Sequence, residues 1–532
     1  MILSNYLVLG LTSLHSYVIA TADIEAPSTC RKTSVAILGG GAAGVAAGKA
    51  LSNASITDFL IIEYQDDIGG RAKHTTFGKK SDGTPYVVEL GANWVQGLGV
   101  SGGPQNPIWT MAQKYNLTNT YSNYSSILTY NETGFTDFSD LLDVYDNADT
   151  IMGDNSGEIL LHNLQDQTAR TGLSLAGWKP KQNMAAQAVE WWEWDWESAY
   201  SPEESSLVFG VAGNNVTFNY FSDANNFVFD QRGFSTIFKH EASAYLKPND
   251  PRLLLRTQVT NISYSTDGVT IHNHDGSCID AEYAICTFSL GVLQNDVVNF
   301  SPQLPDWKET AIQKFAMGTY TKIFLQFNET FWPEDTQYFL YASPTSRGYY
   351  PVWQSLSTPG FLPGSNIIFV TVVHRESYRV ENQSDEETKG EVMAVLRQMF
   401  PNITVPDPIA FMYPRWTTTP WAHGSYSNWP PSTSLEMHEN LRANVDRLWF
   451  AGEALSAEFF GFLHGAWFEG LDSGSSIAAL LKNKTCDSSS GSSAKGCSIR
   501  KHYEVLHGPS PLADYGVLNG WPISSFIDNN SD

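Results

Sequence analysis

The sequence predicts an α/β fold (α+β over the whole chain) in which a lobe built on βαβ units is interrupted twice by a second lobe. Three observations lead to this prediction. The chain has 532 residues, which is too many for one small hydrophobic core and suggests two or more lobes. A short apolar, β-branched run at residues 34–38 enters a glycine-rich turn and then an alanine-rich helical stretch. Two segments, 116–232 and 311–424, lack this βαβ rhythm and alternate with segments of the first kind.

The first 22 residues have the character of a secretory signal peptide. They contain no charged side chain, include an apolar block at 6–11, and end in Ala20-Thr21-Ala22, which fits an A-x-A cleavage site. The apolar run is too short and too interrupted for the alternative, a membrane anchor. We therefore expect no membrane anchor and a secreted protein, extracellular or in a cell wall.

The glycine-rich turn carries the strongest local signal. Gly39, Gly41 and Gly44 fit G-x-G-x-x-G, and a second apolar run at 59–62 ends in Glu63. The glycines let backbone amides approach a pyrophosphate at a helix N-terminus, and the carboxylate can accept hydrogen bonds from a ribose. This context predicts a Rossmann-like, dinucleotide-binding domain.

The middle of the chain is acidic and rich in tryptophan. Aspartates recur every third residue from 137 to 149 between apolar positions, which predicts an amphipathic helix with a solvated acidic face. Residues 190–197 (EWWEWDWE) place three glutamates at helical spacing among four tryptophans.

The C-terminal part returns to the first pattern. Residues 448–453 (LWFAGE) predict a strand that enters a glycine turn with a carboxylate, and a helical run follows at 461–481. The tail, 483–532, is a Ser/Gly-rich linker followed by Pro-, Gly- and Asn-rich sequence, and we assign it no function.

Composition narrows the choice of partners. The net charge is −24, with 32 basic residues against 56 acidic ones, which excludes nucleic acid as an expected partner. Aromatic residues make up 13% of the chain, so it is neither disordered nor fibrous. The acidity would attract cations, although it also serves solubility. N-glycans are expected, because twelve N-x-S/T sequons are present, at Asn53, Asn116, Asn123, Asn131, Asn215, Asn261, Asn299, Asn328, Asn382, Asn402, Asn483 and Asn529.

The five cysteines are too few for a disulfide scaffold. Cys486 and Cys497 flank the Ser/Gly-rich stretch and could close a local loop. No cysteine or histidine cluster predicts a metal site. His272 and His274 could share one face of a strand, but Asp275 and Gly276 beside them predict a hairpin turn instead.

Further motifs occur in a fixed order: VAILGGGAAG, IGGR, ELGANWVQG, FVFDQRG, SLGVL, YTKIFLQF, YFLYASPTSRGYY, YSNWP and FAGE. In these motifs, from about residue 33 to 481, the chain resembles the FAD-dependent amine oxidase family, and most of all secreted polyamine oxidases. The resemblance implies an FAD-binding domain made of residues 30–115, 233–310 and 425–482, and a substrate-binding domain made of 116–232 and 311–424.

The resemblance also implies roles for single residues. Lys322 matches a lysine that holds a water at the reactive nitrogen of the flavin, and Tyr426 and Phe462 match two aromatic residues that sandwich the amine. Tyr320 lies two residues before Lys322 and would line the same cavity. Glu197 matches a substrate carboxylate, Trp94 lies nearby, and Gln96 stands where these oxidases have a glutamate. The residues expected to bind FAD are Gly39, Gly41, Gly44, Glu63, Arg71, Gly91, Val259, Trp416 and Glu453.

The reaction implied is the oxidation of spermine, spermidine or their acetylated derivatives. The amine loses a hydride to the flavin, the imine is hydrolysed to an aldehyde and an amine, and O2 is reduced to H2O2. Monoamine oxidases of the same family attach FAD through a cysteine just before the tyrosine of the aromatic pair. Ser425 stands at that position here, so we expect non-covalent FAD.

Four alternatives remain open at this point. An L-amino-acid oxidase on the same fold would need an arginine clamp, for which Arg347 or Arg415 could serve. A monoamine oxidase is another possibility, and a flavin-binding protein without turnover is a third. Residues 99–103 fit G-x-S-x-G, but a hydrolase elbow needs a strand before it and a helix after it. Here Gly97 and Pro104 flank the motif, which favours a loop.

Overall fold

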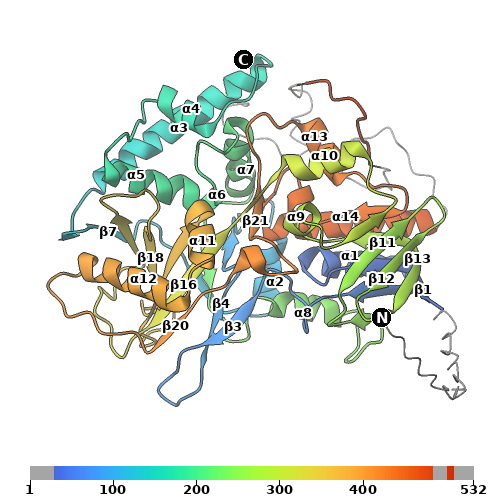
Figure 1. Cartoon of the computed structure of the whole chain (residues 1–532), viewed down its shortest axis with the longest axis horizontal. Helices are drawn as coiled ribbons and strands as arrows, with labels where there is room; N and C mark the ends of the chain where they lie inside the picture. Colours follow the sequence, from blue (N-terminus) through green and yellow to red (C-terminus); the bar gives the residue numbers. More distant parts are fainter. Residues whose placement is uncertain (1–28, 483–499, 509–532) are drawn as a thin grey trace, which may run out of the picture.

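The computed structural model describes residues 29–482 and 500–508, and Figure 1 shows their arrangement. The expected signal peptide and the pair Cys486 and Cys497 lie outside the described residues. The architecture is the mixed α/β one predicted from the sequence, with two large sheets and helices packed around them.

The first large sheet has eight strands in the order β10-β2-β1-β13-β12-β11-β14, with β22 paired to β13. Its strands are β1 (Arg31–Leu38), β2 (Phe59–Ile62), β10 (Leu253–Leu254), β11 (Val259–Tyr264), β12 (Val269–Asn273), β13 (Cys278–Cys286), β14 (Asn299–Ser301) and β22 (Leu448–Phe450). β1 runs parallel to both β2 and β13. Its apolar residues from Val35 to Leu38 are fully buried, which explains their continuous hydrophobic run.

The predicted glycine turn joins β1 to helix α1 (Ala42–Asn53). Gly39 has a φ of +116°, which L side chains rarely adopt. A Cβ on Gly44 would lie 2.0 Å from the carbonyl oxygen of Gly39, so only glycine permits this close approach of helix and turn. The turn and helix are therefore those that the sequence predicts.

The second large sheet has seven strands in the order β20-β16-β19-β18-β17-β7-β8. Its strands are β7 (Ile127–Asn131), β8 (Gly134–Phe135), β16 (Tyr320–Gln326), β17 (Tyr338–Ala342), β18 (Val352–Ser355), β19 (Ile367–Val373) and β20 (Ala410–Met412). Helices α11 (His374–Glu381) and α12 (Asp385–Met399) supply apolar residues such as Val380, Val392 and Leu396 to a core shared with these strands. Its strands thus come from two stretches of chain, 127–135 and 320–412.

Three small sheets lie beside the two large ones. They pair β3 (His74–Phe77) with β4 (Tyr86–Glu89), β15 (Ala316–Gly318) with β21 (Tyr426–Asn428), and β5 (Trp94–Gln96) and β6 (Asn119–Tyr121) with β9 (Asn225–Val228). Through the last of these sheets, residues 94–96 lie beside residues 225–228, more than a hundred positions later in the chain.

The remaining helices are α2 (Pro107–Lys114), α3 (Asp140–Leu161), α4 (Ala169–Leu175), α5 (Met184–Glu190), α6 (Trp196–Ser198), α7 (Leu207–Tyr220), α8 (Thr236–Ser243), α9 (Leu290–Gln294), α10 (Asp306–Lys314), α13 (Leu435–Arg442) and α14 (Leu463–Leu481). Short helical turns lie at Trp191–Asp195, Trp416–Thr418 and Glu453–Leu455. α3 is the predicted amphipathic helix, and the aspartates from Asp137 to Asp149 are exposed as predicted. None of the helices from residue 29 to 482 or in 500–508 is both long and apolar enough to cross a bilayer.

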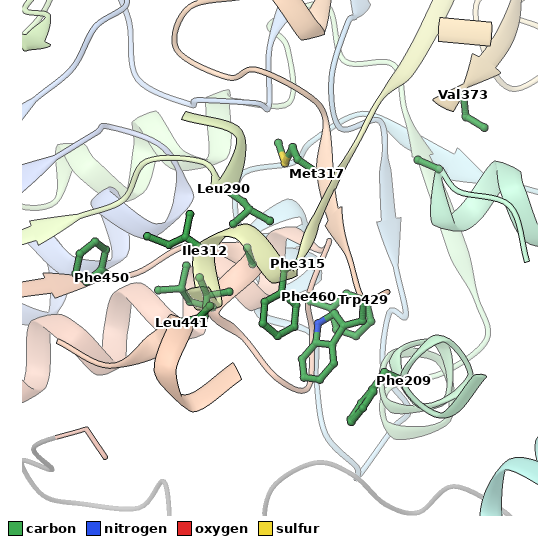
Figure 2. Close-up of a cluster of buried hydrophobic side chains, with 14 of the residues drawn as sticks. Phe209, Leu290, Ile312, Phe315, Met317, Val373, Trp429, Leu441, Phe450 and Phe460 are labelled. Atoms are coloured by element: carbon green, nitrogen blue, oxygen red, sulfur yellow. The ribbon is translucent and has the colours of Figure 1, made fainter. Parts of the chain in front are cut away.

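An aromatic cluster joins segments that are far apart in the chain (Figure 2). Trp429 packs against Phe209 of α7, Phe315 and Phe460, with ring centroids 4.2, 5.0 and 5.3 Å away. The cluster therefore fixes the segment around Tyr426 against the N-terminal approach to α14, and both of these contribute to the site described below.

A disulfide joins Cys30 to Cys278, at the beginnings of the parallel strands β1 and β13. Among the described cysteines, Cys286 is free, and it is buried. After the undescribed linker, residues 500–508 pack back onto the first lobe, and Arg500 is 4% exposed. The sequence offered no signal for either the disulfide or this return.

Candidate active site

A large cavity runs from the glycine turn after β1 to the aromatic segment before α14. Residues of most of the motifs quoted above line it, and FVFDQRG and YFLYASPTSRGYY are the exceptions. Those expected from the sequence are Gly39, Gly41, Glu63, Arg71, Gly91, Trp94, Gln96, Glu197, Val259, Tyr320, Trp416, Tyr426, Glu453 and Phe462. Gly44 packs the helix against the turn instead, and Lys322 lies just behind the wall. The predicted site residues therefore converge on one place.

At one end the cavity meets the N-terminus of α1. Gly41 is the N-cap and provides no side-chain cap, so the first N–H groups of the helix are left for a ligand. The Glu63 carboxylate, 4% exposed, accepts hydrogen bonds from the backbone N–H of Gly40 (2.6 Å) and of Gln65 (2.8 Å). Burial raises the pKa of Glu63, and these two N–H donors oppose the shift. A phosphate site and a carboxylate acceptor thus lie side by side.

A second carboxylate organises the middle of the cavity. Glu453 accepts hydrogen bonds from Arg71 (2.8 Å), from the hydroxyl of Ser427 (2.5 Å) and from the N–H of Gly461 (2.8 Å). Arg71 also donates to the carbonyl of Ser425 (2.9 Å). Three of the quoted motifs, IGGR, YSNWP and FAGE, and Gly461 are therefore tied together at the cavity wall.

Lys322 lies on β16 and is 1% exposed, so its side chain does not point to solvent. Its Nζ donates to the carbonyl oxygen of Gly91 (2.8 Å) and to Oδ1 of Asn93 (2.6 Å), and both of these residues line the cavity. Burial lowers the pKa of Lys322, while the negative charge of buried Glu89 opposes this shift. The lysine is thus held next to the wall with an ammonium that gives up its proton more readily than usual.

Three aromatic residues line the cavity near Lys322. The ring centroids of Tyr320 and Tyr426 are 6.1 Å apart, and Phe462 is the N-cap residue of α14. The hydroxyl of Tyr426 donates to the carbonyl oxygen of Glu197 (2.9 Å). The tyrosine is thereby connected to the carboxylate-bearing segment.

Glu197 lies at the end of the Trp-rich segment, just before Ala199, whose left-handed φ of +56° ends the helix. Its Oε1 accepts a hydrogen bond from the side-chain amide of Gln96 at 2.7 Å. Burial raises the pKa of Glu197 to about 7, and the Gln96 donor opposes the shift. Trp94 and Trp196 meet edge to face beside it with centroids 5.4 Å apart. A carboxylate and aromatic rings therefore share this end of the cavity.

Two other acids of residues 190–197, Glu190 and Asp195, form ion pairs. Glu190 is fully buried and pairs with Arg170 and Arg347 (3.0 Å). Asp195 forms a bidentate ion pair with Arg347, in which both N···O distances are 2.6 Å. Arg415 donates to Asp385 (2.8 Å) and to the carbonyl of Gln383 (3.1 Å). Neither arginine lines the cavity, so neither is placed to clamp a substrate carboxylate there.

Two weaker motifs are loops and turns, as expected. His272 lies in β12, which ends at Asn273, and residues 274–277 form the turn to β13. Ser101 of the G-x-S-x-G match is exposed in a turn. β5 ends at Gln96 and α2 begins only at Pro107, so neither adjoins the motif and it is not the strand-to-helix elbow of a hydrolase. Within the described ranges, no three or more His, Cys, Asp or Glu side chains are grouped so that they could hold a metal ion.

Comparison with known proteins agrees with this geometry. Residues 42–473 match the family described as flavin containing amine oxidoreductase. Polyamine oxidase 7 of rice is 40% identical over 459 residues, which cover 82% of this chain and 93% of the relative. Polyamine oxidase 1 of maize is 39% identical over 470 residues, 85% of this chain and 91% of the relative.

The chain belongs to the flavin-containing amine oxidoreductase family.

The solved structures of putrescine oxidase share the fold of this amine oxidoreductase. A double mutant of that enzyme superposes with a TM-score of 0.65 at 17% identity, covering 85% of this chain and all of the other. The wild type bound to putrescine gives 0.64 at 16% identity. The predicted fold class is thereby confirmed.

The cofactor of this amine oxidoreductase is FAD, and the cavity fits it. The uncapped N-terminus of α1 suits the pyrophosphate, and Glu63 suits the adenosine ribose. Arg71, Trp416 and Glu453 line the cavity beyond that end, toward the aromatic residues. Ser425 occupies the position at which monoamine oxidases carry their cysteine, and its hydroxyl accepts a hydrogen bond from the N–H of Tyr320 (2.9 Å).

Three residues of the site were not found from the sequence. Asn106 and His464 line the cavity and contact each other, and Glu89 lies buried near Lys322. The Oε2 atom of Glu89 is buried and has no hydrogen-bond partner. Their partners are distant in the chain, and no local spacing marks such contacts.

Proposed function

We propose that this amine oxidoreductase is a polyamine oxidase acting on spermine, spermidine or their acetylated derivatives. The observation that carries the proposal is the position of Glu197 beside aromatic rings in the cavity that holds the FAD site. The names of its relatives in rice and maize, at 39–40% identity, support it.

The lining of the cavity matches the chemistry of a polyamine. Such a substrate carries several ammonium groups separated by methylene chains, so it needs apolar walls with carboxylates at intervals. Trp94, Tyr124 and Trp196 supply aromatic walls, and Glu197 supplies negative charge. Among the described residues that line the cavity, Arg71 is the one arginine or lysine, and Glu453 neutralises it.

The same lining disfavours the amino-acid oxidase alternative. A substrate carboxylate needs an unpaired arginine or an equivalent donor set in the cavity. Arg347 and Arg415 are occupied elsewhere, and Arg71 is paired with Glu453. An anionic substrate end would also meet Glu197.

When bound, FAD accepts a hydride from the carbon beside the amine nitrogen and passes two electrons to O2, which yields H2O2. The protein contributes position and proton control. In this proposal Tyr426 and Phe462 hold the amine between their rings, and Glu197 holds a second ammonium group. Lys322 holds a water beside the site, and water hydrolyses the imine to an aldehyde and an amine. Ser425 leaves the FAD bound without a covalent link, since its hydroxyl cannot form a thioether.

We also propose that the protein is secreted and carries N-glycans. The disulfide between Cys30 and Cys278 supports export, since disulfides persist mainly in oxidising compartments. Among the sequon asparagines whose exposure the structure describes, the exposed ones are Asn53, Asn116, Asn299, Asn328, Asn382 and Asn402. The division into an FAD-binding and a substrate-binding domain at the boundaries given above is likewise a proposal. It is supported by the alternation of the two large sheets along the chain.

Anaerobic mixing of the purified yellow protein with spermine tests the proposed activity. We expect the visible flavin absorbance to bleach within seconds, and to recover with release of peroxide when air is admitted. No bleaching with spermine, together with bleaching by a monoamine or an L-amino acid, would overturn the proposed substrate class. Comparison of the aldehyde products then identifies which C–N bond is cleaved.

A further inference from the structure

His464 contacts a predicted catalytic aromatic residue but has no role in the mechanism so far. It is 2% exposed, lies at the second position of α14 and lines the cavity. Its imidazole stacks on the ring of Phe462 with centroids 5.0 Å apart and an angle of 21° between planes. Phe221 and Phe459 close the remaining sides of the imidazole at 5.4 and 4.9 Å. Phe462 therefore rests on a ring that is itself confined.

Hydrogen bonds fix the orientation of this imidazole. Asn106, which is fully buried, caps α2 because its Oδ1 accepts the N–H of Ile108 at 2.8 Å. The amide nitrogen of Asn106 must then be the group that faces Nδ1 of His464 at 3.2 Å. Since that nitrogen donates, Nδ1 accepts, and the imidazole proton resides on Nε2. Nε2 donates in turn to the hydroxyl of Thr217 at 3.1 Å.

The hydrogen-bond network also reaches the carboxylate of Glu197, which the proposed function assigns to substrate binding. The second N–H of the Asn106 amide donates to the carbonyl oxygen of Gln96 at 2.8 Å. The side chain of Gln96 binds Glu197. One buried asparagine thus connects the support of the aromatic wall to the support of the carboxylate.

We propose that His464 is a positioning residue that holds the ring of Phe462 at its angle to the cavity. The inference rests on the proposed function, in which Phe462 forms one wall of the amine site. In this role His464 does not contact the C–H bond of the amine that reacts. It acts on Phe462 through the contact between the two rings. Its hydrogen bond with Asn106 also couples the position of the Phe462 ring to that of Gln96.

The protonation state of His464 suits a site for cations. Burial lowers the pKa of His464 to about 3, and the donor at Nδ1 leaves no lone pair for a second proton. An imidazolium beside Phe462 would repel an ammonium ion at the site. The neutral ring gives stacking and two hydrogen bonds without adding positive charge.

A double-mutant cycle on the rate constant for anaerobic flavin reduction by spermine tests the inference. His464→Gln can keep one donor and one acceptor but removes the stacked ring. We expect it to slow flavin reduction about tenfold in the wild-type background, and Phe462→Ala alone to slow it about tenfold. We expect the double variant to lie within about twofold of Phe462→Ala, because the first loss requires the phenyl ring. Equal losses in both backgrounds, or no loss in either, would overturn the inference.

His438 offers a matched control. It is 1% exposed, stacks on Trp429 with centroids 4.9 Å apart, and contacts the carbonyl of Ala454 at 3.0 Å, but it does not line the cavity. The pKa of this buried histidine is also lowered to about 3. Any effect of His438→Gln should be the same with and without the Phe462 ring. Coupling of His438 to Phe462 as strong as that of His464 would contradict a specific role for His464.

Two further readouts separate positioning from general damage. FAD content and the visible spectrum report whether each variant is folded. If His464→Gln does not retain FAD, Thr217→Val replaces it, because this change removes only the acceptor of the Nε2 proton. We expect Thr217→Val to slow flavin reduction about threefold, and only when Phe462 is present. No effect of Thr217→Val in an FAD-loaded protein would then overturn the inference.

The pH profile gives the last readout. A neutral positioning residue does not titrate, so we expect the pH dependence of kcat/KM to keep its apparent pKa values in His464→Gln. Loss of one of them would mean that His464 acts as an acid or base. Failure of the proposed function is seen separately, in the wild type. If another amine and not spermine bleaches the flavin, the cycle is run with that amine and still decides the role of His464.

Discussion

The side-chain amide of Gln96 donates a hydrogen bond to Oε1 of Glu197 across 2.7 Å inside the cavity. A neutral donor at this distance favours the ionised carboxylate and adds no charge of its own. The resemblance to secreted polyamine oxidases implies a glutamate at the position of Gln96. This chain therefore presents one carboxylate to the amine where a pair is otherwise expected.

Gln96→Glu should change which polyamines are preferred. Two carboxylates at hydrogen-bond distance resist simultaneous ionisation, and a bound ammonium relieves that repulsion. We expect the ratio of kcat/KM for spermine to that for acetylspermine to rise by about tenfold, since acetylation removes one positive charge. Gln96→Met, which removes the hydrogen bond but adds no charge, is the control. An unchanged ratio in Gln96→Glu would exclude Gln96 as a determinant of substrate preference.

The raised pKa of Glu197 predicts a pH dependence of substrate binding. Burial raises this pKa to about 7, so the carboxyl group is neutral at lower pH and negative at higher pH. Only the negative form attracts an ammonium, and KM for spermine should therefore fall as pH rises through about 7. Glu197→Gln should raise KM above this pH and flatten its dependence. Kinetics from about pH 6 to about pH 9 check the sign, and a wild-type KM that rises over this interval would contradict it.

Lys322→Met should slow flavin turnover with FAD still bound. Nζ of Lys322 bonds to Gly91 and Asn93 at the cavity wall, and the proposed role is to hold a water there. Loss of a positioned proton carrier costs about 10²-fold or more in rate, while the visible flavin spectrum should be retained. Stopped-flow traces of reduction and reoxidation show which half-reaction depends on the lysine. Lys308→Met is a matched control, because Lys308 is equally buried but bonds to carbonyls at the end of α13. Unchanged rates in Lys322→Met would remove Lys322 from the mechanism.

Local patterns were sufficient to predict much of the fold. The run at 34–38, the glycines after it and the alanine-rich helix became β1, the turn and α1, because the patterns that mark them are local in the chain. The strand before Gly452 and the helix that follows Phe462 were found in the same way. The disulfide of Cys30 was not predictable, since its partner lies 248 positions later and periodicity carries no information on such pairs.

The candidate site shows the same division. Single residues such as Glu63, Glu453 and Tyr426 were identified through motifs, and all of them line the cavity. The motifs did not identify the buried residues that hold these side chains in position. Asn106 and His464 are 358 positions apart, and their hydrogen bond arises only when α2 and α14 pack together. Glu190 and Glu193 were grouped with Glu197 by sequence, yet Glu190 pairs with Arg347 and does not line the cavity.

The segment that follows the Ser/Gly-rich linker should stabilise the FAD-binding lobe. Arg500, the first described residue after that linker, donates to the carbonyl oxygens of Phe450 (2.6 Å) and Arg442 (3.0 Å). It also pairs with Glu469 (3.2 Å) and Asp472 (2.8 Å) of α14. The guanidinium thus ties β22, which leads to Glu453, to α14, the helix that follows Phe462.

Removal of Arg500 leaves buried Glu469 with Arg442 as its remaining ion-pair partner. Breaking a buried ion pair by loss of one partner costs about 3 kcal/mol or more. We expect Arg500→Met, and truncation before residue 500, to lower the free energy of unfolding in urea by about that amount and to weaken FAD retention on dialysis. Truncation after Gly508 keeps the whole described segment and serves as the control. Equal stability of the two truncated proteins would show that the contacts of Arg500 contribute nothing to the lobe, and Arg500→Lys should restore only part of the loss because a lysine cannot reach all five acceptors at once.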